Sequence, residues 1–233
     1  IELYLVVAAS ALLGRDGAAD KFIAEDGFNI NNRIYMVLEG ENHASMAKTT
    51  GIGILELSTI IDNIKPDMVV TIADRYETMA TAISASYLGV PLVHIQGGEV
   101  TGNIDEKVRH SITKLADIHL VANEDAAKRV KKLGEEEGCI FITGCPSIDI
   151  AAEVVKKDTS NFNIYDKYSG SGDSLDLSNG YIIAMQHPVT TETEDSRYQI
   201  EETLHALNEM EIPTLWFWPN VDAGSDWTSK AIR

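Results

Sequence analysis

The sequence has 233 residues, 44% of them hydrophobic, which is enough for one large globular domain or for one domain and part of another. With 19 basic and 36 acidic side chains, its formal net charge is −17, which argues against a nucleic acid or an anionic membrane as the main partner. A small anionic ligand stays compatible with this charge, because a helix N-terminus can outweigh distant charges.

Two cysteines, Cys139 and Cys145, are too few for a disulfide framework and lie at the ends of the apolar segment CIFITGC. We expect buried thiols in a reducing compartment, and hence a cytoplasmic protein, rather than a bridge or a metal site. No window reaches the roughly eighteen apolar residues that a membrane span needs, and we find no signal peptide. Because the sequence opens within a strand pattern and stops within a helical pattern, we interpret it as a fragment.

Short β-rich segments alternate with helical patterns along most of the chain. ELYLVVAA predicts a strand, and a long helix is expected from about 43 to 64. Further strands are expected at 67–73, 91–96, 118–123 and 139–144, with helices between them. The first of these helices is expected to stop at Gly89, ahead of Pro91. Strand–helix–strand repeats at this spacing predict a buried parallel sheet.

A polar stretch at 156–179, rich in Ser, Asp, Asn and Gly, interrupts this rhythm. After it, YIIAMQHP, a helix around IEETLHALNEM, and PTLWFWPN repeat the strand–helix–strand pattern. We therefore predict an α/β protein with three parts: a Rossmann-like N-terminal domain at 1–160 that lacks its first strand, a linker or surface loop at 161–179, and the truncated beginning of a second Rossmann-like domain at 180–233.

Polar side chains stand at or just beyond the ends of four of the expected strands, and open parallel sheets bind ligands outside the carboxyl ends of their strands. These side chains are Asp74, Arg75 and Glu77; His94, Gln96 and Glu99; Gln186, His187, Thr190, Thr191 and Glu192; and Asn220 and Asp222. They predict a cleft between two half-domains. Asp74 is the hardest to explain otherwise, because an unpaired carboxylate directly after an apolar strand is costly. His94, on a buried strand, is equally well explained as a hydrogen-bonded core histidine.

The segment GGEVTGNIDEKVRH (97–110) joins a strand to a helix, with Asn103 as the N-cap and Glu106 at the N3 position of a capping box. At about 100° per residue the helix has an apolar and a polar arc. The apolar arc holds Ile104, Val108, Ile112 and Leu115, and the polar arc holds Asp105, Glu106, Arg109, His110 and Lys114. On composition alone, an ordinary solvated face with Asp105 paired to Arg109 is the stronger explanation. A plain tight turn likewise explains Gly97-Gly98, which lacks dinucleotide or P-loop spacing.

These candidate side chains suit a sugar-nucleotide enzyme, because carboxylates exchange protons with a sugar carbon while arginine, histidine and helix N-termini neutralise a diphosphate. The motifs DRYE, HIQGGE, NIDE, GCPSID, QHPVTTE and PNVDAGS, in this order, resemble the hydrolysing UDP-N-acetylglucosamine 2-epimerases of sialic-acid pathways. The resemblance implies a GT-B-like fold of two Rossmann-type domains and no metal or nicotinamide cofactor. The implied reaction eliminates UDP across C1–C2 and then adds water to release N-acetylmannosamine.

The resemblance implies roles for Asp74, Asp105, His94, Arg75, His187 and Asn220, whose motifs match, and we add Glu99, Gln96 and Arg109 as candidates from the segment 94–110. The catalytic candidates are Asp74, Asp105, Glu99 and His94. The substrate-binding candidates are Arg75, Gln96, Arg109, His187 and Asn220. Gln96 stands where many members have a catalytic Glu, and an amide cannot exchange a proton. Either Glu99, three residues on, supplies the missing carboxylate, or the reaction relies on Asp74 and Asp105.

Two further departures concern histidines that are common in the family. IADR places Ile72-Ala73 before the aspartate, and ASAL places Ala11 where a histidine is frequent. These departures leave open a modified UDP-sugar as substrate, the non-hydrolysing epimerase, a GT-B glycosyltransferase, or a catalytically impaired UDP-sugar-binding protein. The expected partners are the UDP-sugar and further copies of the chain in a dimer or tetramer, with neither nucleic acid nor membrane. The fragment alone is expected to be inactive.

Overall fold

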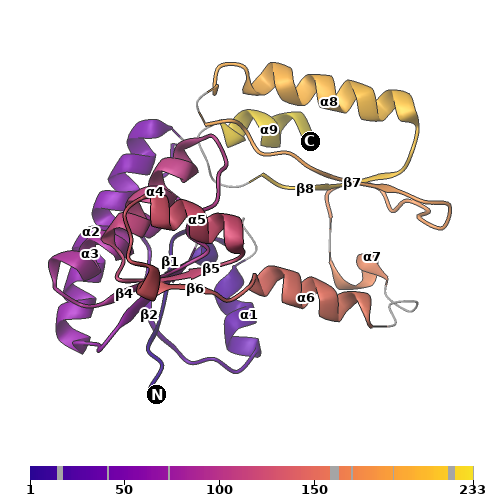
Figure 1. The fold of residues 1–233 in the computed structure, drawn as a ribbon. Helices are drawn as coiled ribbons and strands as arrows, with labels where there is room; N and C mark the ends of the chain where they lie inside the picture. The colour runs from indigo at the N-terminus through magenta and orange to yellow at the C-terminus, as the bar shows by residue number, and fades with distance from the viewer. Residues whose placement is uncertain are drawn as a thin grey trace. The chain divides into compact units, whose positions relative to one another are not determined.

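A computed structural model describes residues 1–14, 18–40, 42–72, 74–157, 163–168, 170–190, 192–219 and 224–232. Contacts divide the chain into two compact units, Ile1–Gly144 and Cys145–Arg233. Figure 1 shows helices and strands alternating along the chain. The domain borders expected at 160 and 179 stay a prediction.

The first unit is built from parallel strands and the helices that connect them. Its elements are β1 (Leu5–Ala8), a 3-10 helix (Ala9–Leu12), α1 (Ala19–Glu25), β2 (Ile30–Ile34), α2 (His43–Ile64), β3 (Val69–Ile72), α3 (Thr78–Tyr87), β4 (Leu92–Ile95), α4 (Ile104–Leu115), β5 (Ile118–Val121), α5 (Glu124–Lys132), a 3-10 helix (Glu137–Cys139) and β6 (Ile140–Ile142). β1 and β2 form one parallel pair, and the other strands form a parallel sheet in the order β3-β4-β5-β6. The strand–helix alternation expected here is confirmed.

Helices α3, α4 and α5 pack on one face of the four-stranded sheet. That face includes Thr71, Leu92 and His94, all of which are buried. On the opposite face of β3, Val70 and Ile72 are 56% and 48% exposed, so the expectation of a strand buried on both faces is wrong for β3. The reason is that an apolar strand sequence does not specify which of its two faces becomes covered.

A second layer of the core joins the two sheets through α2. Its buried members are Ala9, Ile34, Met36, Leu57, Ile61 and Ala80. Gly53 of α2 allows this packing, because a β-carbon there would collide with the end of Met36 and with the β-carbon of Ala80. Val69 of β3, the strand that leads to Asp74, packs against this cluster.

The second unit is smaller. Its elements are α6 (Pro146–Val155), the short α7 (Ile164–Lys167), β7 (Ile182–Met185), α8 (Ser196–Met210), β8 (Thr214–Phe217) and α9 (Ser225–Ile232). β7 and β8 pair in parallel with α8 as the connection between them, as the sequence pattern predicts. Cys139 and Cys145 are not joined in a disulfide and are half-buried rather than buried. Among the described helices, none is long and apolar enough to cross a membrane.

Candidate active site

The candidate site of the first unit lies beyond the carboxyl ends of β3 and β4, at the start of α4. Asp74 follows β3, and its carboxylate forms an ion pair with the guanidinium Nη2 of Arg109 on α4. Nη1 of the same guanidinium donates to the backbone carbonyl of Glu99 at 2.8 Å. One side chain therefore joins the end of β3 to the loop after β4. Asp74, which is costly unless paired, has its partner here.

Arg109 corrects a prediction made from helical periodicity. The polar arc of α4 places it on a solvated face, but its side chain is only 3% exposed. The backbone between β4 and α4 lies over the first turns of the helix, and helical periodicity does not register such a covering loop. Burial lowers the pKa of Arg109 from its usual value, yet a guanidinium stays protonated near neutral pH.

The turn after β4 depends on both of its glycines. Gly98 has a φ of +81°, and a β-carbon there would collide with the backbone carbonyl of Ala126. A β-carbon at Gly97 would lie 3.0 Å from His94 Nδ1 and from the hydroxyl of Thr113. Packing against β4, α4 and α5 therefore explains the two glycines as a tight turn, the plainer of the two sequence interpretations.

Gln96 opens this turn in the left-handed region. Its φ is +63°, a conformation that costs a side-chain-bearing residue about 1 kcal/mol, and its backbone N–H donates to the carbonyl of Leu120 at 2.8 Å. The side chain is half-buried. Strain of this kind is common at functional sites, where the surrounding fold enforces it.

Two more charged side chains hold the 97–103 loop. Arg129 of α5 donates to the carbonyl of Gly98 at 3.1 Å. The carboxylate of Glu106 accepts the N–H groups of Gly102 at 2.7 Å and Thr101 at 3.1 Å. The hydrogen bond from Gly102 is the main reason why the pKa of Glu106 is lowered. Sequence reasoning missed Arg129, because no local pattern links α5 to this loop.

The expected N-cap of α4 is confirmed, but the capping box is wrong in one detail. The side chain of Asn103 accepts the N–H of Asp105 at 2.9 Å. Glu106 bonds the two amides that precede Asn103 rather than the N–H of Asn103 itself. The tight turn brings those amides within reach of the first helical turn, so the carboxylate closes the loop as well as the helix end.

His94 lies inside the core. It is fully buried, and its Nδ1 is 3.2 Å from the hydroxyl of Thr113. That hydroxyl donates to the carbonyl of Arg109 at 3.0 Å, so it accepts from His94, and we assign the imidazole proton to Nδ1. This geometry is that of a hydrogen-bonded core histidine, the alternative that the sequence left open. The catalytic assignment of His94 stays a prediction.

The remaining candidates of the first unit lie on the segments that carry the pair. Glu99 is half-buried in the loop, and Asp105 is half-buried in the first turn of α4. Nε of Arg75 lies 2.8 Å from the Glu77 carboxylate, and its guanidinium lies over the ring of Tyr76. One guanidinium thus contacts both the Asp74 carboxylate and the backbone carbonyl of Glu99.

In the second unit, His187 follows β7, while Asn220 lies outside the described residues. The loop after β7 meets the start of α9, because a β-carbon at Gly224 would lie 2.7 Å from the Ser196 hydroxyl and 3.2 Å from Pro188. Ser225, at the first position of α9, is buried. The roles of His187 and Asn220, and the cleft between half-domains, stay predictions.

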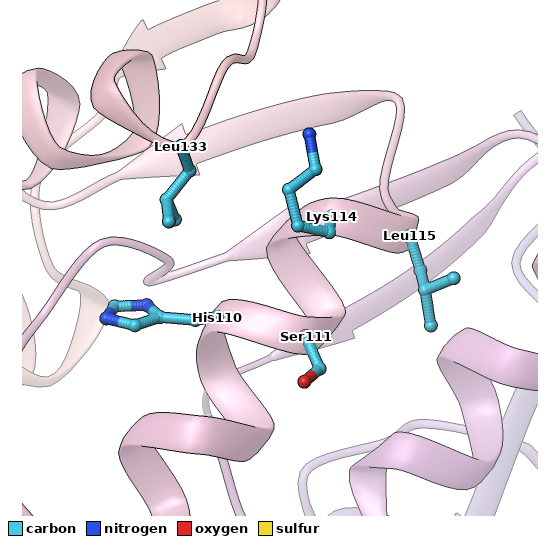
Figure 2. A pocket seen from close by; sticks show the side chains of 5 residues that line it. All are labelled: His110, Ser111, Lys114, Leu115 and Leu133. Atoms are coloured by element: carbon cyan, nitrogen blue, oxygen red, sulfur yellow. The ribbon is translucent and has the colours of Figure 1, made fainter.

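A surface hollow lies beside α4, and neither Asp74 nor Arg109 lines it. Figure 2 shows its lining of His110, Ser111, Lys114 and Leu115 from α4, with Leu133 from the end of α5, around a volume of about 450 Å³. Lys114 pairs with Glu135 at 2.5 Å, and Glu135 also lies 3.4 Å from Nε2 of buried His119. The hollow includes none of the predicted site residues. Among the described residues, no group of three or more His, Cys, Asp or Glu side chains is placed to hold a metal ion.

Known proteins match this chain over almost its whole length. A family model described as UDP-N-acetylglucosamine 2-epimerase matches residues 12–233. A Legionella pneumophila protein named UDP-N,N'-diacetylbacillosamine 2-epimerase (hydrolyzing) is 31% identical over 100% of this chain and 60% of its own length. A Neisseria meningitidis UDP-N-acetylglucosamine 2-epimerase is 32% identical over 97% of this chain and 57% of its own length. The chain thus spans about 60% of these relatives.

Solved structures show the same fold. The structure of UDP-GlcNAc 2-epimerase from Neisseria meningitidis bound to UDP-GlcNAc has a TM-score of 0.70 and covers 92% of this chain and 58% of its own. Its sequence identity of 16% limits this likeness to the fold. The likeness confirms the predicted α/β, GT-B-like fold class.

Proposed function

The chain belongs to the UDP-N-acetylglucosamine 2-epimerase family, and from this membership we propose that the full-length protein is a hydrolysing 2-epimerase of UDP-linked N-acetylhexosamines. The substrate is UDP-GlcNAc or a modified relative of it, and the products are UDP and the C2-inverted free sugar. The Legionella relative, which carries the word hydrolyzing in its name, supports the hydrolytic reaction.

The observation that carries this proposal is the Asp74–Arg109 pair beyond the end of β3, with Asp105 in the first turn of α4. An ionised Asp74 accepts the C2 proton while the C1–O bond breaks and its electron pair leaves on UDP. Water then adds across the C1–C2 double bond, with hydroxide at C1 and a proton at C2 on the opposite face. We assign Asp105 to the second proton transfer. Arg75, His187 and Asn220 are assigned to UDP, because guanidinium, imidazole and amide groups bind diphosphate oxygens.

Gln96 stands where many family members have a catalytic Glu, and Glu99 is our candidate for the carboxylate that replaces it. Gln96 is fixed at φ +63° by the turn, and its amide neither gives nor accepts a proton at neutral pH. Glu99 lies three residues on in the same loop, and its backbone is anchored by Arg109. Anchored backbone next to a half-exposed carboxylate suits a general acid or base.

The non-hydrolysing epimerase is the second candidate function, because the Neisseria relative is named a 2-epimerase without mention of hydrolysis. A catalytically impaired UDP-sugar-binding protein is the third candidate, because the amide of Gln96 cannot exchange a proton. The modified substrate is represented by UDP-N,N'-diacetylbacillosamine, which the name of the Legionella relative specifies. A dimer or tetramer and a cytoplasmic location stay predictions, of which light scattering on the full-length protein tests the first.

One experiment separates these functions. The full-length protein is incubated with UDP-GlcNAc, and in parallel with UDP-N,N'-diacetylbacillosamine, in deuterated water, and the products are followed by NMR. Free N-acetylmannosamine-type sugar with deuterium at C2, together with UDP, is the expected result. A UDP-linked C2 epimer favours the non-hydrolysing reaction. Calorimetric binding of UDP with no turnover of either sugar favours the binding protein and rejects our proposal.

A further inference from the structure

The surroundings of Arg109 differ from those of a substrate-binding residue. Its side chain is 97% withdrawn from solvent, and its described contacts are with other protein groups. Nη2 meets the carboxylate of Asp74, Nη1 lies 2.8 Å from the Glu99 carbonyl, and both nitrogens lie 3.5 Å from the Thr101 hydroxyl. The planar guanidinium fork is thus used to join two protein segments.

We propose that Arg109 is a positioning residue, which acts on the reaction through Asp74 and does not bind the sugar nucleotide. It holds the carboxylate in one orientation, keeps it ionised, and ties it to the loop that carries Glu99. This inference rests on the proposed 2-epimerase reaction and replaces the substrate-binding role suggested by the sequence.

The burial of the Asp74–Arg109 pair favours this role. The other strand-end cation, Arg75, is held by Glu77 at 2.8 Å. Ionisable groups on the elements that meet here include Glu99 in the loop; Asp105, Glu106, Lys107 and His110 on α4; His94 on β4; His43 and Lys48 on α2; and Arg129 on α5. The Asp74 side chain is only 23% exposed, so without the guanidinium its carboxylate would be partly desolvated and would lack its ion-pair partner, which favours the protonated form.

The consequence for the reaction follows from proton balance. Asp74 takes the C2 proton only when it is ionised, as the C1–O bond breaks and UDP leaves. A protonated Asp74 cannot take part in this step. Loss of Arg109 therefore acts most strongly at low pH, and it acts on the chemical step rather than on substrate affinity.

The test compares Arg109→Gln and Arg109→Lys with the wild-type full-length protein, by kcat, KM and the pH profile of kcat/KM with UDP-GlcNAc. For Arg109→Gln we expect kcat to fall by about 100-fold with KM within about threefold. We also expect the acidic limb of the profile to move up by at least about one pH unit, since a paired cation shifts a carboxyl by ~1–3 units. Arg109→Lys keeps the charge but not the fork, so its limb stays near the wild type while kcat stays reduced.

Control variants separate this effect from a general loss of charge. Lys128→Gln removes an exposed cation that pairs with Asp125 at 3.2 Å, and it should leave the profile unchanged. Arg129→Gln removes the contact with the Gly98 carbonyl but keeps the Asp74 pair, so its acidic limb should not move. A KM raised more than tenfold in Arg109→Gln with an unmoved limb would show substrate contact and overturn the proposal. A lower melting temperature with unchanged kinetics would overturn it too, in favour of a purely structural role.

A second readout does not depend on turnover. The ¹³C carboxyl signal of Asp74, identified by its loss in Asp74→Asn, is titrated in the wild type and in Arg109→Gln. The titration should move to higher pH in the variant, and an unmoved titration rejects the positioning role. If Arg109→Gln does not fold, Arg109→Lys tests the positioning role: a reduced kcat with an unmoved acidic limb of the pH profile supports it. If the wild type turns over no UDP-sugar, the proposed function fails while this titration still tests the role of Arg109.

Discussion

Nδ1 of His94 lies 3.2 Å from the hydroxyl of Thr113, and that hydroxyl in turn donates to the carbonyl of Arg109. The chain of bonds connects the middle of β4 to α4 beneath the glycine turn. Because α4 carries both Arg109 and Asp105, these hydrogen bonds hold in place the helix that presents the candidate site. His94 thus supports the site from within the core.

Thr113→Val tests this support. The change removes the acceptor of the buried Nδ1–H while keeping the shape of the side chain, and an unpaired buried donor costs ~1–3 kcal/mol. We expect urea unfolding to show that loss. Thr113→Ser keeps the hydroxyl and should retain most of the stability. Equal losses in both variants would mean that packing of the methyl group, and not the hydrogen bond, stabilises this contact.

Gly98→Ala should be far more damaging than Gly102→Ala. Both residues have positive φ, +81° and +75°, so both substitutions carry a backbone cost of about 1 kcal/mol. Only Gly98 also has the Ala126 carbonyl where the β-carbon would go, while no atom lies within 4 Å of the corresponding position at Gly102. We expect a loss above ~2 kcal/mol for Gly98→Ala in thermal or urea unfolding. Similar losses at the two positions would contradict the predicted collision.

Helix caps, helix ends and the strand–helix order could be predicted, because each depends on residues that are close together in the sequence. Asn103 caps α4, and Gly89, with a φ of +67°, follows the end of α3 as a helix-stop glycine. The β–α alternation is also visible, because apolar runs and amphipathic periods are properties of short windows. Polar residues at strand ends were therefore found, even though the sequence does not say which of them meet.

What escaped prediction depends on contacts between distant segments. Helical periodicity assigns Arg109 to water, but the loop before α4 buries it, and its partner Asp74 lies 35 residues earlier. Arg129 and Glu106 hold the loop through backbone groups, which no side-chain pattern records. The exposed face of β3 was missed for the same reason, because an apolar strand sequence does not reveal which of its faces is covered.

The stability of the first unit should fall at mildly acidic pH because of His119. This side chain on β5 is 1% exposed, and burial lowers its pKa, with Glu135 at 3.4 Å opposing the effect in part. The unfolded state, in which histidine titrates near 6.5, therefore binds the proton more readily. This contribution to stability is complete above about pH 6.5 and is lost as the pH falls through the folded-state pKa.

Urea unfolding of the wild type and His119→Gln at about pH 8 and about pH 5.5 measures this effect. The wild type should lose more of its unfolding free energy between the two conditions than the variant. The difference between the two pH values is the informative quantity, because the substitution itself alters packing. Equal losses would show that another group dominates the acid sensitivity.

Asp74→Asn and Asp105→Asn should each abolish most of the turnover of the full-length protein. Removing a proton-transferring group costs typically about 10²- to 10⁴-fold, and the amide keeps the size of the side chain. We expect kcat with UDP-GlcNAc to fall in this range, while calorimetry shows UDP binding within a few-fold of wild type. Asp125→Asn, at a side chain that is 73% exposed, is the matched control and should retain full activity. Retained turnover in either site variant would remove that residue from the mechanism.

The carboxylate that Gln96 lacks is located by comparing two isosteric exchanges. Glu99→Gln should lower kcat about 100-fold if Glu99 transfers a proton, since an amide of the same size cannot. If Glu99 has this role, Gln96→Glu should change kcat only a few-fold, because Glu99 already supplies the carboxylate. The exchange leaves the backbone of position 96 at φ +63° as it is. Unfolding curves of both variants check that neither effect comes from lost structure. If Glu99→Gln keeps its activity while Gln96→Glu gains at least about tenfold, Glu99 has no catalytic role, and the wild-type reaction proceeds on Asp74 and Asp105 alone.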